Sequence, residues 1–329
     1  MPSQTGKKTI GLFVLGTLFA LLLAGIFYWQ AVGADISNPR GNFWRVVRHG
    51  IPAYTSTPAQ GHTVLIVNGG ENWRKMRNGL IMRGSQWILA MALLAMGLFY
   101  FLVGSDKLEK PRSGVKIERF TIGERVLHWY IALLFTIMAI TGLSLLLGRL
   151  ALIPIFGHPV VSGYLQASKV LHNYCGPLLL VGILLASLIW FRYNIPKKMD
   201  VQWFKNMGGM IGHGSRPHAG KINGGEKGWF WLVVIFGIAV GITGVLLDFP
   251  IWGQSRLTMQ ISHIIHVAVA VLFVTCSFGH IYVGTIGIEG VFEAMWTGSV
   301  DVIWAQQHAD LWYQEKIREK EAKPETPLP

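Results

Sequence analysis

Six long apolar runs limit what this chain can fold into. Each holds 19 to 28 consecutive residues without an Asp, Glu, Lys or Arg. A helix needs roughly 20 apolar residues to cross a hydrocarbon core about 30 Å thick. The alternating ten-residue segments that are typical of barrel strands do not occur in the sequence. We therefore predict an all-α membrane protein with spans at residues 10–29, 86–104, 126–148, 170–191, 228–247 and 257–284.

The basic residues orient these spans. The formal net charge is +12, and the loops at 105–125 and 192–227 carry six and seven Lys or Arg residues. The loops at 149–165 and 248–256 carry one each. Short loops rich in Lys and Arg stay in the cytoplasm, so the first two loops and the C-terminus are predicted to be cytoplasmic. The charge thus serves orientation in lipid, and nucleic acid is not an expected partner.

The predicted organisation follows from these spans. Residues 1–34 are either a signal peptide or a first transmembrane helix, because Lys7 and Lys8 precede an apolar run and Val32-Gly33-Ala34 resembles a cleavage site. Either alternative places the following loop region outside the membrane. The predicted segments after residue 34 are a periplasmic loop region at 35–85, a transmembrane helix at 86–104, a cytoplasmic linker at 105–122, a four-helix core at 123–288 and a cytoplasmic tail at 289–329.

Four histidines fall into two pairs by depth. The orientation places His128 and His280 near the cytoplasmic face, and His172 and His266 near the outer face. Ionisable side chains at membrane depth are costly and are usually functional. His266 and His280 are separated by about 21 Å along one face of a helix. A six-coordinate b-type haem needs two axial ligands from facing helices. We therefore predict two bis-histidine haems, an outer one on His172 and His266 and an inner one on His128 and His280.

Two neighbouring residues qualify this prediction. His263 competes with His266, but it is rotated about 100° from His280 around the helix, so we interpret it as a group beside the ligands. Gly142 follows His128 by fourteen residues and is predicted to lie level with the outer haem, where the lack of a side chain admits a porphyrin. A helix–helix contact is the alternative for Gly142.

Other polar positions receive plainer interpretations. Cys175 and Cys276 lie in separate spans and are expected to pack as small apolar residues. The absence of a Cys-x-x-Cys-His motif excludes a covalently attached haem. Lys169 and Arg125 each precede a predicted ligand by three residues, so they are candidate partners of haem propionates as well as ordinary interfacial cations. His308 lies in a charged terminal helix and is expected to be solvated.

Six stretches of the sequence resemble those of a known family. They read ERVLHW (124–129), VLHNYCG (170–176), RYNIPKKMDVQWF (192–204), NGGEKGWFW (223–231), SHIIH (262–266) and GHIY (279–282). Together they resemble the cytochrome b (gamma) subunit of respiratory formate dehydrogenases, in its N-terminally extended form. The likeness covers about residues 115–315 and includes loops as well as the four histidines.

The resemblance implies a four-helix dihaem cytochrome b bundle, preceded by one or two further transmembrane helices, in the inner membrane of a bacterium. It implies that a molybdenum or tungsten alpha subunit oxidises formate outside, so that the formate-oxidising site is on another chain. An iron–sulfur beta subunit would pass electrons to the outer haem, and the inner haem would reduce a quinone. By the same resemblance, Asn223 and Gly225 neighbour the quinone, although an ordinary turn also explains the NGG sequence.

Two alternatives remain at this point. A hydrogenase or a sulfur-compound reductase can use a similar cytochrome b subunit, but the loops NIPKK and NGGEKG favour formate dehydrogenase. A haem-free membrane anchor or transporter would use its histidines to relay protons. That class predicts a carboxylate-lined pore, and the apolar runs contain no Asp or Glu.

Overall fold

The structure is a computed structural model that describes residues 68–210 and 216–322. The predicted span at 10–29 and the choice between a signal peptide and a helix for residues 1–34 lie outside the described residues. Within the described part, five helices are long and apolar enough to cross a membrane. The prediction of an all-α, multi-span protein is confirmed.

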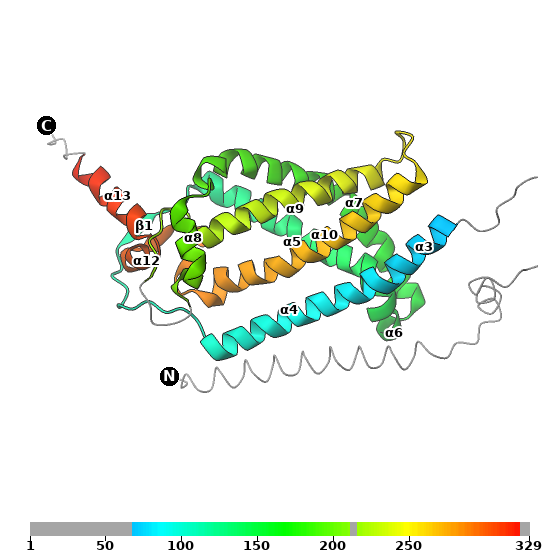
Figure 1. Cartoon of the computed structure of the whole chain (residues 1–329), viewed down its shortest axis with the longest axis horizontal. Coiled ribbons are helices and arrows are strands. Elements are labelled where there is room, and N and C mark those ends of the chain that lie inside the picture. The colour runs from blue at the N-terminus through cyan, green and yellow to red at the C-terminus, as the bar shows by residue number, and fades with distance from the viewer. Residues whose placement is uncertain (1–67, 211–215, 323–329) are drawn as a thin grey trace, which may run out of the picture.

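The spans form a bundle of long, nearly aligned helices (Figure 1). A continuous helical stretch comes first, made of α3 (Asn68–Met76), the π-helical turn η1 (Arg77–Ile81) and α4 (Met82–Val103). The core helices are α5 (Ile122–Ala151), α7 (His158–Trp190), α9 (Gly224–Asp248) and α10 (Arg256–Tyr282), which continues into the π-helical turn η4 (Val283–Gly287). Short connecting helices are α6 (Ile153–Phe156), η2 (Phe191–Tyr193), α8 (Lys198–Lys205) and η3 (Met207–Gly209).

Several helices extend beyond the apolar runs that predicted them. The helix with the predicted span 170–191 begins at His158, where Pro159 stands in its first turn. The first described helix begins at Asn68, inside the range predicted as a loop region. The physical reason is the same in both places. Hydropathy detects only the part of a helix that lies in hydrocarbon, whereas backbone hydrogen bonding continues through polar residues.

Side-chain caps fix the start of two core helices at the basic end of the bundle. Thr121 and Glu124 form a reciprocal capping box at the start of α5, seven residues before His128. Asn223 and Glu226 form a second capping box at the start of α9. Each box satisfies backbone N–H groups that a helix start leaves unpaired. The first capping box therefore fixes where α5 begins, about two helical turns before the candidate ligand His128.

Each core helix packs against the next one along the chain, and glycines and apolar residues lie at these contacts. α5 packs on α7, α7 on α9, and α9 on α10, while α4 lies along α10 (Figure 1). A Cβ atom on Gly182 of α7 would lie 2.8 Å from the Tyr130 ring, and one on Gly237 would lie 2.5 Å from Ile183. Close helix approach through glycine is the usual way to pack helices in lipid. The bundle core contains Leu134, Cys175, Leu179 and Ile183, as predicted for Cys175.

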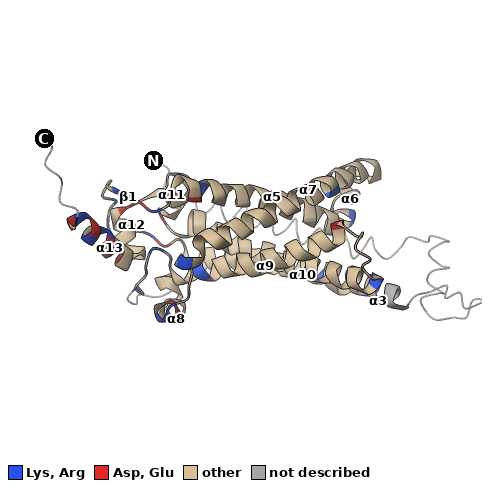
Figure 2. Ribbon diagram, turned by 90° about the horizontal axis from the view of Figure 1, so that it is seen from above, with Lys and Arg blue, Asp and Glu red and all other residues tan. Residues whose placement is uncertain are grey.

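A small cap closes one end of the bundle. We define the terminal cap as β1 (Lys116–Glu118), β2 (Ser299–Asp301), α11 (Val291–Trp296), α12 (Val302–His308) and α13 (Asp310–Glu321). β1 and β2 pair antiparallel, with Ile117 opposite Val300. Figure 2 shows many of the acidic and basic residues at this end, whereas the bundle itself is mostly uncharged. The cap has its own core of Phe120, Ala294, Val300, Trp304, Ala305, Ala309 and Trp312.

The expectation that His308 is solvated is wrong. Its side chain is only 8% exposed and its ring lies 5.1 Å from that of Trp304. Residues between Ala294 and Trp312 therefore contribute apolar side chains to the core of the terminal cap. Burial lowers the pKa of His308 to about 4.

Candidate cofactor site between the helices

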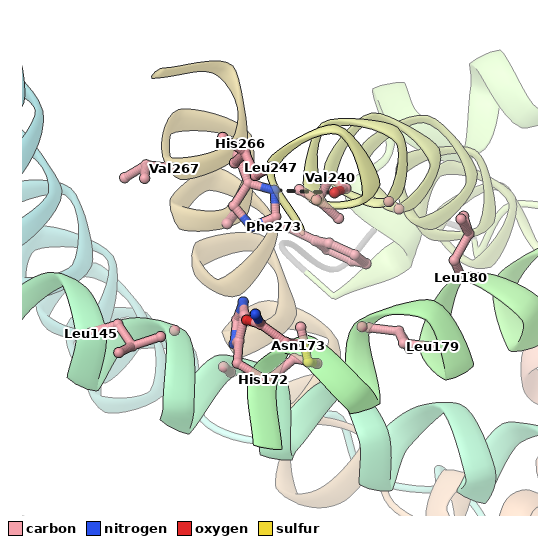
Figure 3. Close-up of a pocket in the computed structure, with 18 of the residues that line it drawn as sticks. Leu145, His172, Asn173, Leu179, Leu180, Val240, Leu247, His266, Val267 and Phe273 are labelled. Carbon is pink, nitrogen blue, oxygen red and sulfur yellow. Dashed lines mark hydrogen bonds between the residues drawn. The ribbon is translucent and has the colours of Figure 1, made fainter. Parts of the chain in front are cut away.

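The structure brings the four predicted ligand histidines together in the predicted pairs. The ring centroids of His172 and His266, the outer pair, are 6.2 Å apart. Those of His128 and His280, the inner pair, are 6.3 Å apart. Figure 3 shows His172 and His266 pointing toward one another from α7 and α10. His266 and His280 share the continuous helix α10, so the two pairs are separated by about 21 Å along it.

Both separations fit two imidazoles on opposite sides of one metal ion. With metal–nitrogen bonds of about 2 Å and ring centroids about 1 Å behind each nitrogen, the expected centroid separation is about 6 Å. The described residues hold no group of three or more His, Cys, Asp and Glu residues that could bind a metal alone. Each pair could supply two ligands to a metal ion whose remaining four positions a macrocycle would fill. A haem meets this need.

The outer pair faces into an elongated apolar cavity of about 530 Å³. This volume falls in the range of roughly 300–1,000 Å³ that is usual for bound small molecules. Its walls come from α5, α7, α9 and α10, and Phe273 lines it as well (Figure 3). Phe135 is a further lining residue. Its glycines, which remove side-chain bulk from the wall, are Gly142, Gly176, Gly237, Gly241 and Gly244. The site therefore suits a large, flat, apolar group.

Both rings of the outer pair make a hydrogen bond through Nδ1. The Oγ1 atom of Thr141 lies 2.8 Å from Nδ1 of His172. The Oγ1 atom of Thr243 lies 3.1 Å from Nδ1 of His266, and the carbonyl oxygen of Val240 lies 3.1 Å from the same nitrogen (Figure 3). Such bonds fix the orientation of a ligating imidazole and choose which nitrogen is free.

Glycine follows each of these threonines and faces the same ring. A Cβ on Gly142 would lie 3.0 Å from Cε1 of His172, so Gly142 lies at the outer cavity as predicted. A Cβ on Gly244 would lie 3.3 Å from Cε1 of His266. The sequence pattern did not predict Gly244. A signal was nevertheless present, because Ile-Thr-Gly occurs at both 140–142 and 242–244.

The inner pair has a different environment. The Trp229 ring stacks on the His280 ring at 4.5 Å, with only 8° between their planes. The Nδ1 atom of His128 is buried and has no hydrogen-bond partner among the described residues. Trp129 contacts the His128 ring edge to face at 5.3 Å. The sequence analysis did not predict the contacts of Trp129 and Trp229 with the candidate ligands.

His263 lies at the margin of the outer cavity. Its ring contacts the ring of Trp73 at 5.5 Å in a T-shaped arrangement and does not face another histidine. Lys169 and Arg77 also line this cavity. Lys169 was a predicted neighbour of a haem propionate, whereas Arg77 belongs to the helical stretch before the core and was not anticipated.

The two residues predicted to neighbour a quinone have structural partners. The Oδ1 atom of Asn223 accepts a hydrogen bond of 2.9 Å from the Glu226 N–H. A Cβ on Gly225 would lie 2.4 Å from the Trp203 ring, so that ring covers this glycine. Asn223 caps α9 and Gly225 lies in its first turn, about 9 Å and about 6 Å along the helix from Trp229 at the inner pair. Their role beside a quinone stays a prediction.

The comparisons with known proteins agree with this geometry. The sequence model of a family described as prokaryotic cytochrome b561 matches residues 119–298, which is more than half of the chain. The chain belongs to this family. Membership implies that this multi-pass membrane cytochrome binds b-type haem. The matched range begins after α4, so the helical stretch from Asn68 to Val103 lies outside it.

Curated relatives of this cytochrome are subunits of formate dehydrogenases. The cytochrome b556(fdo) subunit of Escherichia coli is 27% identical over 212 residues, which are 64% of this chain and 97% of the relative. The nitrate-inducible cytochrome b556(Fdn) subunit of the same organism is 29% identical over 208 residues, with 62% and 92% covered. The Haemophilus influenzae subunit is 27% identical over 217 residues, with 63% and 87% covered. The resemblance seen in the sequence is confirmed.

Proposed function

We propose that this cytochrome is the electron-transferring membrane subunit of a formate dehydrogenase complex in a bacterial inner membrane. Family membership and the three formate dehydrogenase relatives support the partner complex. The observation that carries the proposal is the presence of two facing imidazole pairs, at 6.2 and 6.3 Å, well separated along α10.

In this proposal the chain holds two b-type haems. His172 and His266 would hold the outer haem, and His128 and His280 would hold the inner haem. When bound, each haem would supply one-electron redox chemistry. Between the pairs, the rings of Phe135 and Phe273 pack at 4.7 Å.

The proposed electron path runs from the outer to the inner side of the membrane. A catalytic subunit with molybdenum or tungsten oxidises formate, an iron–sulfur subunit delivers electrons to the outer site, and a quinone accepts them beside the inner site. Asn223 and Gly225 are the proposed neighbours of the quinone. Moving one electron inward against a negative interior costs about 2.3 kcal/mol per 100 mV. The path therefore builds membrane potential if protons for the quinone come from the cytoplasm.

The proposed topology rests on charge. The described parts of the basic loops 105–125 and 192–227 lie with the terminal cap at one end of the bundle (Figure 2). His128 lies near this end, seven residues after the Thr121 cap of α5. Basic short loops favour the cytoplasmic side. This places the C-terminus in the cytoplasm and leaves the outer pair facing the iron–sulfur subunit.

The test is an optical spectrum of the solubilised complex, reduced first with formate and then with dithionite. Two b-type haems per chain, both reduced by formate, are the expected result. Reduction by dithionite alone would overturn the assignment to formate dehydrogenase and favour a hydrogenase or a sulfur-compound reductase. A complex without a b-type band would contradict the pairing of the histidines and favour a haem-free anchor or transporter.

A further inference from the structure

The outer pair is surrounded by a duplicated three-residue motif. Ile140-Thr141-Gly142 on α5 and Ile242-Thr243-Gly244 on α9 face the two rings from neighbouring helices. In each copy the threonine hydroxyl contacts Nδ1 of one histidine, and the glycine leaves room beside Cε1 of the same ring. The two histidine rings therefore have matching contacts, although they come from different helices.

The hydrogen bonds of Thr141 decide where the proton of the His172 ring lies. A hydroxyl has one proton to donate, and the carbonyl oxygen of Ile137 lies 2.7 Å from Oγ1 of Thr141. A carbonyl oxygen can only accept, so the threonine donates to it. The contact of 2.8 Å with Nδ1 must then be donated by the ring. His172 therefore carries its proton on Nδ1, and its Nε2 keeps a free lone pair.

The second copy gives the same result for His266. Thr243 donates to the carbonyl oxygen of Ala239 at 2.7 Å, so its oxygen accepts from Nδ1 of His266. The carbonyl oxygen of Val240, 3.1 Å away, can also only accept from this nitrogen. Both outer ligands thus have the tautomer that binds a metal through Nε2. This is a property of the chain itself.

We propose that Thr141 and Thr243 are positioning residues that lower the reduction potential of the outer haem. The inference rests on the proposed function. An imidazole that donates its second N–H to an acceptor is a stronger electron donor to the metal, which favours the oxidised iron. The inner pair lacks a matching contact at His128, whose buried Nδ1 has no partner among the described residues.

The experiment is a redox titration of the purified, intact complex, followed at the b-type absorbance band. Thr141→Val and Thr243→Val remove each hydroxyl with little change in volume. In each variant one midpoint potential is expected to rise while the other stays constant. A tenfold easier reduction corresponds to about 59 mV for a one-electron couple. Thr141→Ser and Thr243→Ser keep the hydroxyl and are expected to restore the original value.

Matched controls exist on the same bundle. Thr136 on α5 bonds to the Ala132 carbonyl at 2.8 Å, and Thr275 on α10 bonds to the Val271 carbonyl at 2.7 Å. Neither hydroxyl has a contact with a histidine ring among the described hydrogen bonds. Thr136→Val and Thr275→Val are therefore expected to leave both potentials unchanged. A rise in these controls equal to that of the test variants would overturn the inference.

The remaining outcomes are also decisive. Unchanged or lowered potentials in both valine variants, at two haems per chain, would overturn the inference. If a valine variant loses the outer haem, a serine variant with two haems and the original potential supports it. A serine variant that also loses the haem would overturn it. Failure of formate to reduce the unmodified complex would instead count against the proposed function, because dithionite still permits the titration.

Discussion

At the residue scale, the outer site depends on the absence of a side chain at Gly142. A Cβ there would lie 3.0 Å from Cε1 of His172, so the ring would have to move. We expect Gly142→Ala to weaken haem retention slightly and Gly142→Val to bring the haem content from two toward one per chain. The measurement is the haem-to-protein ratio of the purified complex. Gly123→Ala on the same helix is the control, because a Cβ there meets nothing within 4 Å.

The series has a clear opposing outcome. A Gly142→Val variant with two haems per chain would show that the helix–helix alternative for this glycine is correct and that the His172 ring has room to move. Loss of haem in Gly123→Ala as well would show a general defect of α5 and not a local effect at the outer site.

Single residues also show which part of the site the sequence could predict. The pairing of the four candidate ligand histidines could be predicted from membrane depth and helical period, because both depend directly on position in the chain. Thr141 and Thr243 did not follow, since a threonine in a helix commonly bonds to a carbonyl of its own preceding turn and needs no further partner. Only the packing of α5 on α7 and of α9 on α10 shows that the same hydroxyls also accept from the histidine rings.

At the element scale, the helical stretch before the core adds a cation to the outer cavity. Arg77 lines this cavity although its helix lies outside the range that matches the family. A nearby positive charge disfavours the oxidised, more positive iron. We therefore expect Arg77→Gln to lower the midpoint potential of the outer haem, opposite in sign to the threonine variants. Arg77→Lys keeps the charge and should remain near the original value.

A redox titration of the intact complex measures this change. An Arg77→Gln potential equal to the original, with two haems retained, would mean that the added helix does not influence the outer site electrostatically. A shift of the inner haem alone would contradict the assignment of Arg77 to the outer end of the bundle.

The terminal cap is expected to lose stability as the pH falls. His308 has a pKa of about 4 because burial disfavours its charged form, against about 6.5 when unfolded. Of the charged groups around it, Asp106 and Glu109 raise the value, while Arg216 and Arg119 lower it. The unfolded chain therefore binds a proton below pH 6.5 that the folded cap does not. The loss grows from pH 6.5 to about 4 and reaches at most about 3 kcal/mol.

Amide hydrogen exchange of α12 in the solubilised protein, at pH 7 and at pH 5, measures this effect. The opening free energy, corrected for the intrinsic exchange rate, is expected to be smaller at pH 5. His308→Phe removes the titrating group and should reduce the difference between the two pH values. Equal opening free energies at pH 7 and pH 5 in the unmodified protein would show that His308 is protonated within the folded cap.

The sequence predicted the positions of the transmembrane helices better than it predicted their lengths. Each described span covers the apolar run that predicted it, apart from Gly104 at the end of the first run, because burial in hydrocarbon requires uninterrupted apolar residues. The extension of α7 back to His158 and the start of α3 at Asn68 were not predicted, since water-exposed helix has no hydropathy signal. The terminal cap was missed for a different reason. Its core gathers Phe120 with residues from 294 to 312, and contacts across such a distance have no local pattern.

At the scale of the whole molecule, the two histidine pairs make the bundle directional. The outer pair opens into a large cavity at one end, and the inner pair contacts Trp229 on the helix that begins with Asn223 and Gly225 at the other. A single long helix, α10, supplies one ligand to each pair and so fixes the separation between them. This geometry implies that the two sites act one after the other, and this order can be tested.

Removing one site at a time tests this order. In His172→Ala the outer haem is lost, and formate should no longer reduce the inner haem, because about 21 Å of bundle then separates it from the point of electron entry. A water-soluble quinol, supplied as reductant, should still reduce that haem from the other side. In His128→Ala the outer haem should be reduced by formate, while quinone reduction stops. The reverse pattern, with quinol failing in His172→Ala and quinone reduction surviving in His128→Ala, would place the quinone at the outer face and reverse the proposed direction.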